Sequence, residues 1–256
     1  MLSMIDPNKF INSATQRVLA FAAHPDDLDF GAAGTVAAMT AAGIEVQYCI
    51  MTDGDAGGFD DRDPAETVRL RHEEQRVAAA RVGVSTVHFM GERDGYLEPS
   101  HDVMRQVVRL IRQVRPQIVM AMHTERNWDR IQRSHPDHLA CGEAVTRAIY
   151  PAVENPFAYP ELLAEEGLEA YKLPWLWLYG APKERENGFV NITEFFAQKM
   201  DALRAHFTQH PDVGAMEKFV LEQCQANGVR ANMPSDELAE GFHLVAVNAD
   251  DTIAGF

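Results

Sequence analysis

The chain is organised around the apolar stretch Val18-Leu19-Ala20-Phe21-Ala22-Ala23, which runs directly into the polar sequence His24-Pro25-Asp26-Asp27. The apolar stretch has the length of a buried strand, and the polar sequence after it is typical of a loop. Small residues at 34–42 predict a tightly packed helix that ends at Gly43, and residues 44–51 predict a second strand. This order favours two parallel strands joined by a helical crossover.

The same alternation continues to about residue 150. Further strands are predicted at 84–90 and 118–122, and helices at 64–81, 103–114 and 139–149. Strands that alternate with helices of about 10–15 residues indicate an α/β fold, a Rossmann-like doubly wound and mostly parallel sheet with helices on both faces. Ligands bind such sheets at the carboxyl ends of the strands. We therefore expect the functional site in the loops after the first, second and fourth strands.

The pattern of the sequence changes at Pro151, after which several prolines occur in a stretch rich in predicted loops. We expect residues 1–150 to form the Rossmann-like core that carries the site. Residues 151–256 are expected to form a C-terminal cap that completes the same domain and shapes its pocket. Within this cap the pattern predicts strands at 175–179 and 242–247 and a helix at 194–206.

The acidic composition narrows the range of partners. Lys and Arg together number 23 and Asp and Glu number 38, so the formal net charge is −15. Such a surface repels nucleic acid and anionic lipid, so we expect neither as a partner, and solubility is the simplest role of the charge. Hydrophobic residues make up 46% of the chain, enough for a full core without disulfides or a structural metal. Any bound metal is therefore expected to be catalytic.

The three cysteines indicate the cellular compartment in which the protein is found. Cys49, Cys141 and Cys224 are widely separated and odd in number, which favours buried thiols in a reducing cytoplasm over a disulfide framework. The first residues lack the cationic and apolar segments of a signal peptide. No apolar run approaches the roughly 18 residues needed to span a bilayer. The sequence thus predicts a cytoplasmic protein.

The first chemical motif follows the first strand. His24 and Asp27 lie three residues apart where a strand gives way to a helix, and Asp26 lies between them. Two adjacent ionised carboxylates repel each other unless a cation is close by. An alternative use of these residues is the capping of a helix N-terminus, where Asp is favoured.

The second motif, His135-Pro136-Asp137-His138, opens a helix after the fourth strand, and Pro136 suits the first helical position. Both motifs together bring imidazoles and carboxylates to neighbouring strand ends. Mixed nitrogen and oxygen donors suit Zn²⁺, and three protein ligands leave one position open for catalysis.

We expect the metal ligands to be His24, Asp27 and His138. Asp26 is expected to act as the general base, and His135 is expected to stabilise an oxyanion while a carboxylate such as Asp137 keeps it protonated.

The chain resembles the LmbE-like or PIG-L deacetylases, zinc hydrolases that act on N-acetylglucosaminyl substrates. The resemblance implies a Rossmann-like fold and the metal, base and oxyanion roles just given, and relatives often form oligomers. It also implies that Arg71 and Asp94 hold sugar hydroxyls; without it, Arg71 would be read as part of a solvated helical face. Besides the two motifs, it rests on Thr52-Asp53-Gly54-Asp55-Ala56-Gly57, Arg71 with Glu74, Arg93-Asp94-Gly95, residues 203–209 and Ala239-Glu240-Gly241-Phe242.

Two positions depart from the family pattern. Leu28 stands where the first motif usually ends in Glu, which puts the support of the metal ligands in question, although Asp29 could partly substitute. Arg133 stands where some relatives place a Tyr, which would favour an anionic substrate group or another route to oxyanion stabilisation.

The sequence therefore predicts a zinc-dependent hydrolase that removes an acetyl group from a small N-acetylglucosamine-type amino sugar or glycoconjugate. One alternative is an amidase that cleaves a larger acyl group from a related thiol-glycoside conjugate. Another is a metal- or sugar-binding protein without turnover. Asp26 and His135 argue against the last, because binding alone requires neither a base nor an oxyanion group.

Overall fold

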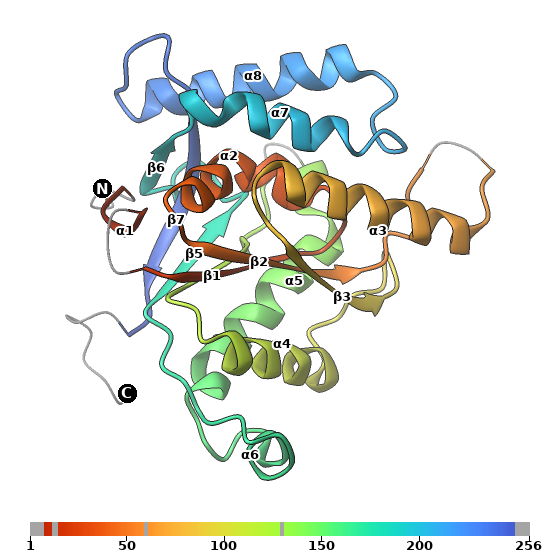
Figure 1. Cartoon of the computed structure of the whole chain (residues 1–256), viewed down its shortest axis with the longest axis vertical. Coiled ribbons are helices and arrows are strands. Elements are labelled where there is room, and N and C mark those ends of the chain that lie inside the picture. Colours follow the sequence, from red (N-terminus) through yellow and green to blue (C-terminus); the bar gives the residue numbers. More distant parts are fainter. Residues whose placement is uncertain (1–7, 12–14, 59–60, 129–130, 249–256) are drawn as a thin grey trace.

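The computed structural model describes residues 8–11, 15–58, 61–128 and 131–248. Its centre is a single seven-stranded sheet between layers of helices (Figure 1). The strands are β1 (Arg17–Ala22), β2 (Glu45–Thr52), β3 (Thr86–Glu92), β4 (Ile118–Met122), β5 (Trp175–Tyr179), β6 (Gly188–Asn191) and β7 (Ala239–Ala246). The longer helices are α2 (Asp27–Ala41), α3 (Pro64–Arg81), α4 (His101–Val114), α5 (Pro136–Arg147), α7 (Phe196–Arg204) and α8 (Val213–Arg230). Shorter helical segments are α1 (Asn8–Ile11), η1 (Ile131–Ser134), η2 (Ala148–Val153), α6 (Pro160–Glu166) and η3 (Thr193–Phe195).

The strand order is β3-β2-β1-β4-β5-β7-β6. The first five strands in this order run parallel, whereas β7 pairs antiparallel with both β5 and β6. This is a doubly wound α/β fold, and the predicted fold class is confirmed. The order of the strands reverses between β1 and β4, and ligands bind such sheets in the crevice at this reversal. Both chemical motifs follow these two strands.

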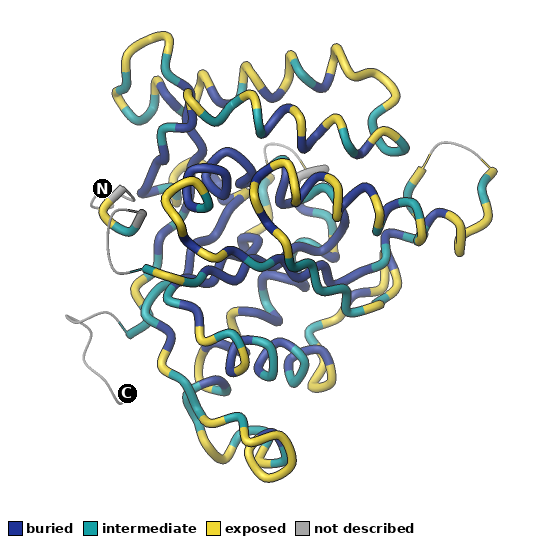
Figure 2. The backbone as a smooth tube through the Cα atoms, viewed as in Figure 1, coloured by how far each residue is buried: buried dark blue, intermediate teal, exposed yellow. Residues whose placement is uncertain are grey.

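Helices cover both faces of the sheet (Figure 1). On one face α2 and α3 lie against the strands, α7 packs on α2 and α3, and α8 packs on β7 and β6; α4 and α5 cover the other face. Figure 2 shows the resulting burial, in which the central strands are dark blue along most of their length. Continuous apolar strands of this kind are typical of a parallel sheet buried on both faces.

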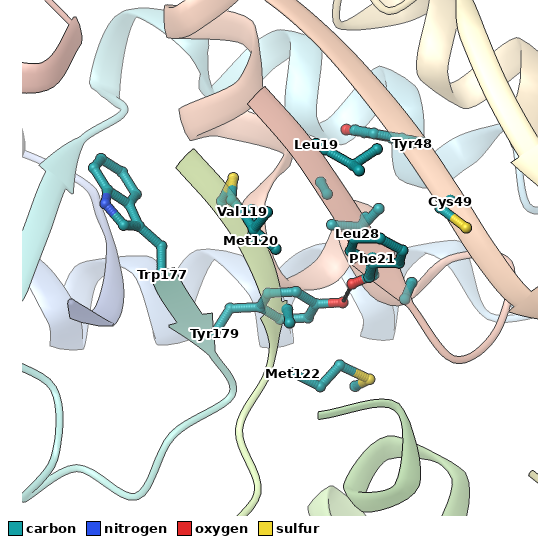
Figure 3. Packing of buried hydrophobic residues seen from close by; sticks show 14 of the residues in the cluster. Leu19, Phe21, Leu28, Tyr48, Cys49, Val119, Met120, Met122, Trp177 and Tyr179 are labelled. Atoms are coloured by element: carbon teal, nitrogen blue, oxygen red, sulfur yellow. Dashed lines mark hydrogen bonds between the residues drawn. The ribbon is translucent and has the colours of Figure 1, made fainter. Parts of the chain in front are cut away.

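The central strands are also joined by one buried polar contact. Tyr179 at the end of β5 donates a hydrogen bond from its hydroxyl to the carbonyl of Phe21 in β1, at 2.8 Å (Figure 3). The bond passes across the end of β4, where Met122 lies. It satisfies a buried hydroxyl that would otherwise be costly, and it ties the strands together at the carboxyl edge that carries the site.

Some elements differ from the sequence prediction. The helix predicted to begin at residue 34 begins at Asp27, because the polar residues after β1 already form its first turns. The helix α8 was not predicted, although the Asp212 side chain accepts a hydrogen bond from the Ala215 N–H as an N-cap. Cys49 and Cys141 are buried, as expected.

The C-terminal segment contributes β5, β6 and β7 to the same sheet. The division into a core at 1–150 and a cap at 151–256 remains a prediction. Among the described residues, we find no helix that combines the length and the apolar character needed to cross a bilayer.

The close approach of α5 to β4 gives a test of how the second motif is positioned. A Cβ on Gly142 would clash with the backbone carbonyl of Met122. We expect Gly142→Ala to lower the free energy of unfolding by about 1–3 kcal/mol, since backbone must move to accommodate the methyl group. Urea denaturation measures this change.

The matched control is Gly214→Ala at the exposed start of α8, where the nearest atom to an added Cβ is 3.7 Å away. This variant should be neutral or slightly more stable than the wild type. Equal effects of the two substitutions would contradict the packing described for α5.

Candidate functional site

The two chemical motifs meet because β1 and β4 are neighbours in the sheet. His24 and Asp26 follow β1 directly, α2 begins at Asp27, and His135 is the N-cap of α5. The residue before α2, Asp26, makes no side-chain capping bond. Its carboxylate is therefore not used as a helix cap, and it points to other partners.

The carboxylate of Asp27 joins the two motifs. Its Oδ2 lies 3.3 Å from Nδ1 of His24 and also accepts a hydrogen bond from the His24 N–H at 2.7 Å. Its Oδ1 lies 3.1 Å from Nε2 of His138. One carboxylate thus faces an imidazole nitrogen from each of the two loops.

The other ring nitrogen of His24 faces two further carboxylates. Nε2 lies 3.1 Å from Asp137 Oδ2 and 3.1 Å from Asp94 Oδ1. Asp137 is fully buried, and it also accepts hydrogen bonds from the N–H groups of Gly95 (2.6 Å) and Leu97 (3.2 Å). Because Nε2 of His24 is held in this way, Nδ1 is the nitrogen that remains directed at Asp27.

The carboxylates give this pocket a strong preference for positive charge. Burial alone would lower the pKa of His24, but the hydrogen bonds and charges of the surrounding carboxylates raise it to about 12. Burial alone would raise the pKa of Asp27, yet His138 and His24 hold it well below its usual range. A pocket that stabilises a protonated imidazole so strongly also favours a bound cation.

His135 lies beside these residues. Its ring centroid is 4.8 Å from that of His24 and 5.4 Å from that of His138. Its Nδ1 accepts a hydrogen bond from the Asp137 N–H at 3.3 Å. The expected contact between His135 and the Asp137 carboxylate is absent from the contacts among the described residues, because that carboxylate binds His24 and two backbone N–H groups. With Nδ1 as an acceptor, Nε2 of His135 is the nitrogen left to donate.

Asp26 has an unusual backbone conformation, with φ at 99°. This left-handed conformation is disfavoured for a residue with a side chain and occurs mostly where function requires it. The Asp26 N–H donates to Oε1 of Gln75 in α3 at 2.9 Å, which holds the strained residue in place. Its carboxylate lies 3.3 Å from Nε2 of His210 and 3.8 Å from the Arg71 guanidinium.

Arg71 and Asp94 also lie at this edge of the sheet. Arg71 is buried and donates to the carbonyls of Gly54 (3.0 Å) and Pro25 (2.8 Å), so the solvated-face interpretation of this residue is wrong. Its guanidinium lies 3.9 Å from the Asp94 carboxylate. The pair therefore borders the same buried group of histidines and carboxylates.

Two sets of side chains in the described residues have the geometry to hold a metal ion. One set is His24, His135 and His138, and the other is His24, Asp94 and Asp137; within each set the donor atoms lie within 4.8 Å of one another. Asp27 lies against the first set through both of its oxygens. The site thus offers mixed nitrogen and oxygen donors, with the imidazole of His135 and the carboxylate of Asp26 close by.

Comparison with known proteins identifies the family. A family model described as PIG-L, GlcNAc-PI de-N-acetylase, matches residues 19–149, just over half of the chain. The chain belongs to the PIG-L family. The resemblance inferred from the motifs is thereby confirmed.

Individual PIG-L relatives extend the match. The chain is 31% identical over 198 residues to a diacetylchitobiose deacetylase of Thermococcus kodakarensis, covering 77% of this chain and 71% of that protein. It is 31% identical over 212 residues to a probable N-acetyl-alpha-D-glucosaminyl L-malate deacetylase 2 of Bacillus subtilis, covering 76% and 83%. Among solved structures, an inhibitor complex of the N,N'-diacetylchitobiose deacetylase from Pyrococcus horikoshii is similar with a TM-score of 0.83 and 25% identity, covering 96% of this chain and 95% of that one.

The departures from the PIG-L pattern have structural outcomes. Leu28 is fully buried in the core. Asp29 binds Nε2 of Gln75 at 2.9 Å and Nε2 of His206 at 2.8 Å, so it orients the side chain that holds Asp26. Asp29 thus supports Asp26 indirectly, through Gln75. The side chain of Arg133 lies outside the described residues.

Sequence reasoning missed two polar contacts of buried side chains, one at the site and one between β4 and β7. Gln75 lies one helical turn after Arg71 on the buried face of α3, and that spacing was the available signal. His123, at the end of β4, is paired with His243 of β7 at 3.1 Å, a contact between strands far apart in sequence.

The buried His123 of this PIG-L chain predicts a pH-dependent stability. Burial lowers the pKa of His123 to about 4. Protonation therefore favours the unfolded chain, where a histidine has a pKa near 6.5, and stability is lost as the pH falls from about 6.5 towards 4. In urea denaturation, the wild type should lose about 2 kcal/mol more between pH 7.5 and pH 5 than His123→Asn. Identical losses would contradict the burial of this imidazole.

Proposed function

We propose that this protein is a zinc-dependent hydrolase that removes the acetyl group from an N-acetylglucosamine-type amino sugar or glycoconjugate. The observation that carries the proposal is the meeting of Asp27 with His24 and His138 at the reversal of strand order, beside Asp26 and His135. The PIG-L relatives support it, because those proteins are named as deacetylases of diacetylchitobiose and of an N-acetylglucosaminyl malate.

His24, Asp27 and His138 are the proposed metal ligands. Two donor atoms bound to one tetrahedral zinc at 2.0–2.2 Å lie about 3.3–3.6 Å apart. Asp27 Oδ2 lies 3.3 Å from Nδ1 of His24 and Asp27 Oδ1 lies 3.1 Å from Nε2 of His138, so this carboxylate is at ligand spacing from one donor of each loop. Asp137 would then hold His24 in position. A carboxylate bonded to the ring nitrogen that does not bind the metal fixes the orientation of a ligating histidine.

Zinc, when bound, polarises a carbonyl group and lowers the pKa of a water molecule towards 7. Asp26 accepts the proton of the attacking water and later delivers it to the nitrogen of the leaving amine. The hydrogen bond from its N–H to Gln75 keeps this carboxylate on the site side of the loop. Nε2 of His210, in the segment between α7 and α8, lies 3.3 Å from the Asp26 carboxylate and holds it in place.

His135 is the proposed oxyanion donor. Because its Nδ1 accepts the Asp137 N–H, its Nε2 can donate to the oxygen that gains negative charge during attack. Arg71 and Asp94 are the proposed sugar-binding pair, one a donor and the other an acceptor for hydroxyl groups. They lie 3.9 Å apart and border the Asp26 side of the site.

We further propose a cytoplasmic location, for which the three free and buried cysteines are the support. A homo-oligomer, as in relatives, remains a prediction from the resemblance. The reading as a binding protein without turnover is weakened by Asp26, whose strained backbone is held by a dedicated hydrogen bond. Strain of this kind is retained where chemistry uses it.

The test is acetate release from N-acetylglucosaminides by the zinc-loaded protein, compared between the wild type and Asp26→Asn. The wild type should release acetate, and the variant should lose at least about 100-fold in kcat while it keeps its zinc, since the amide cannot accept the proton. Metal content by elemental analysis accompanies the rates. A variant as fast as the wild type would remove Asp26 from the mechanism, and the absence of acetate from every glycoside would remove the function.

A further inference from the structure

A cavity of about 390 Å³ opens beside two of the proposed metal ligands and extends under α8. Asp27 and His138 form part of its wall, whereas the proposed base, oxyanion donor and sugar-binding pair do not. We call it the α8 cavity. Its wall thus shares Asp27 and His138 with the site but does not include Arg71 or Asp94.

The walls of the α8 cavity that come from the core are largely apolar. Phe30 lines it from α2, Met122 lines it from β4, and Val220 and Cys224 line it from α8. Met122 ends β4 beside Tyr179, another wall residue (Figure 3). The lining positions 220, 223, 224 and 227 of α8 recur at helical spacing, so one face of the helix forms this wall.

The charged side chains of the wall already have partners. Lys199 is buried and donates to Glu240 at 2.7 Å and to the carbonyls of Asp29 and Phe30. Glu240 also accepts from two backbone N–H groups of α2, and Glu186 pairs with Arg230. Since Lys199, Glu240 and Glu186 are paired inside the protein, they offer a charged ligand little, and the apolar part of the wall favours an apolar ligand.

The volume exceeds what an acetyl group needs. An engineered apolar cavity of about 150 Å³ is large enough to hold benzene. The α8 cavity, at about 390 Å³, falls in the range of small-ligand pockets and has space for a linear chain of about eight carbons.

We propose that the α8 cavity binds the hydrocarbon chain of an N-acyl group longer than acetyl, so that the protein cleaves N-acyl as well as N-acetyl amino sugars. The inference rests on the proposed function, because it places the scissile carbonyl at Asp27 and His138. The sugar then extends towards Arg71 and Asp94, and the acyl chain extends under α8. In the reaction the oxygen of water bonds to the carbonyl carbon, the carbon–nitrogen bond breaks, and the products are a carboxylate and the protonated amino sugar.

The test uses one sugar with acyl groups of increasing length: N-acetyl-, N-butyryl-, N-hexanoyl- and N-octanoylglucosamine. The zinc-loaded wild type is assayed for release of glucosamine, and kcat/KM is measured for each compound. We expect kcat/KM to rise with chain length by up to about fourfold per added methylene, since each enters an apolar surface. A value that is flat or falls from acetyl to hexanoyl would overturn the inference.

Variants at a cavity-lining and an exposed position of α8 provide the matched comparison. Val220→Phe adds volume inside the cavity, and Leu221→Phe makes the same kind of change at an exposed neighbour. The ratio of hexanoyl to acetyl kcat/KM should fall at least tenfold in the first and stay at the wild-type value in the second. If Val220→Phe does not fold, Cys224→Ala enlarges the cavity and should raise the octanoyl to acetyl ratio. Ratios unchanged in the cavity variants would refute the assignment.

Three further outcomes bear on the two proposals. Release of glucosamine from the acetyl compound but not from the longer ones keeps the proposed function and removes the acyl-chain inference. No release from any compound removes the proposed function itself. A response of Val220→Phe to the aglycone of N-acetylglucosaminides, with no response to acyl length, would assign the cavity to the aglycone and also overturn the inference.

Discussion

The structure depends on the placement of one buried carboxylate, that of Asp27, between imidazoles from two separate loops. Asp27 lies at the start of α2 and His138 lies in the first turn of α5, and these helices follow neighbouring parallel strands. Negative charge is costly to bury unless a cation offsets it. Here protonated imidazoles do so, and a divalent cation bound by the same donors would do so more strongly. The reversal of strand order thus brings together the side chains, and the charge of the carboxylates favours a bound cation.

The C-terminal segment supports this arrangement from behind. His206 binds Asp29, Asp29 binds Gln75, and Gln75 accepts the N–H of Asp26. The left-handed backbone of Asp26 is therefore fixed by a chain of hydrogen bonds that begins beyond α7. The segment expected to act mainly as a cap also extends the sheet through β5, β7 and β6 and provides one wall of the α8 cavity. Residues distant in sequence from the motifs thus determine both the geometry of the base and the shape of the pocket.

The sequence predicted the features that depend on local pattern. Buried parallel strands are continuous apolar runs, so their positions were predictable, and the polar motifs after β1 and β4 could be placed at the same sheet edge. Features that depend on long-range contacts were not predictable in this way. The contact of the Asp137 carboxylate with His24, rather than with His135, spans 113 residues of sequence. The burial of Arg71 depends on the carbonyls of Gly54 and Pro25, because only the folded loops bring these acceptors to α3.

The central claim is that a metal is held by His24, Asp27 and His138 while Asp137 holds the far nitrogen of His24. A crystal structure of the zinc-loaded protein, with anomalous diffraction recorded at the zinc absorption edge, tests it most directly. The account predicts one strong anomalous peak bonded to Nδ1 of His24, to the Asp27 carboxylate and to Nε2 of His138. A peak located elsewhere, or bonded to His24 through Nε2 in place of Asp137, would contradict it.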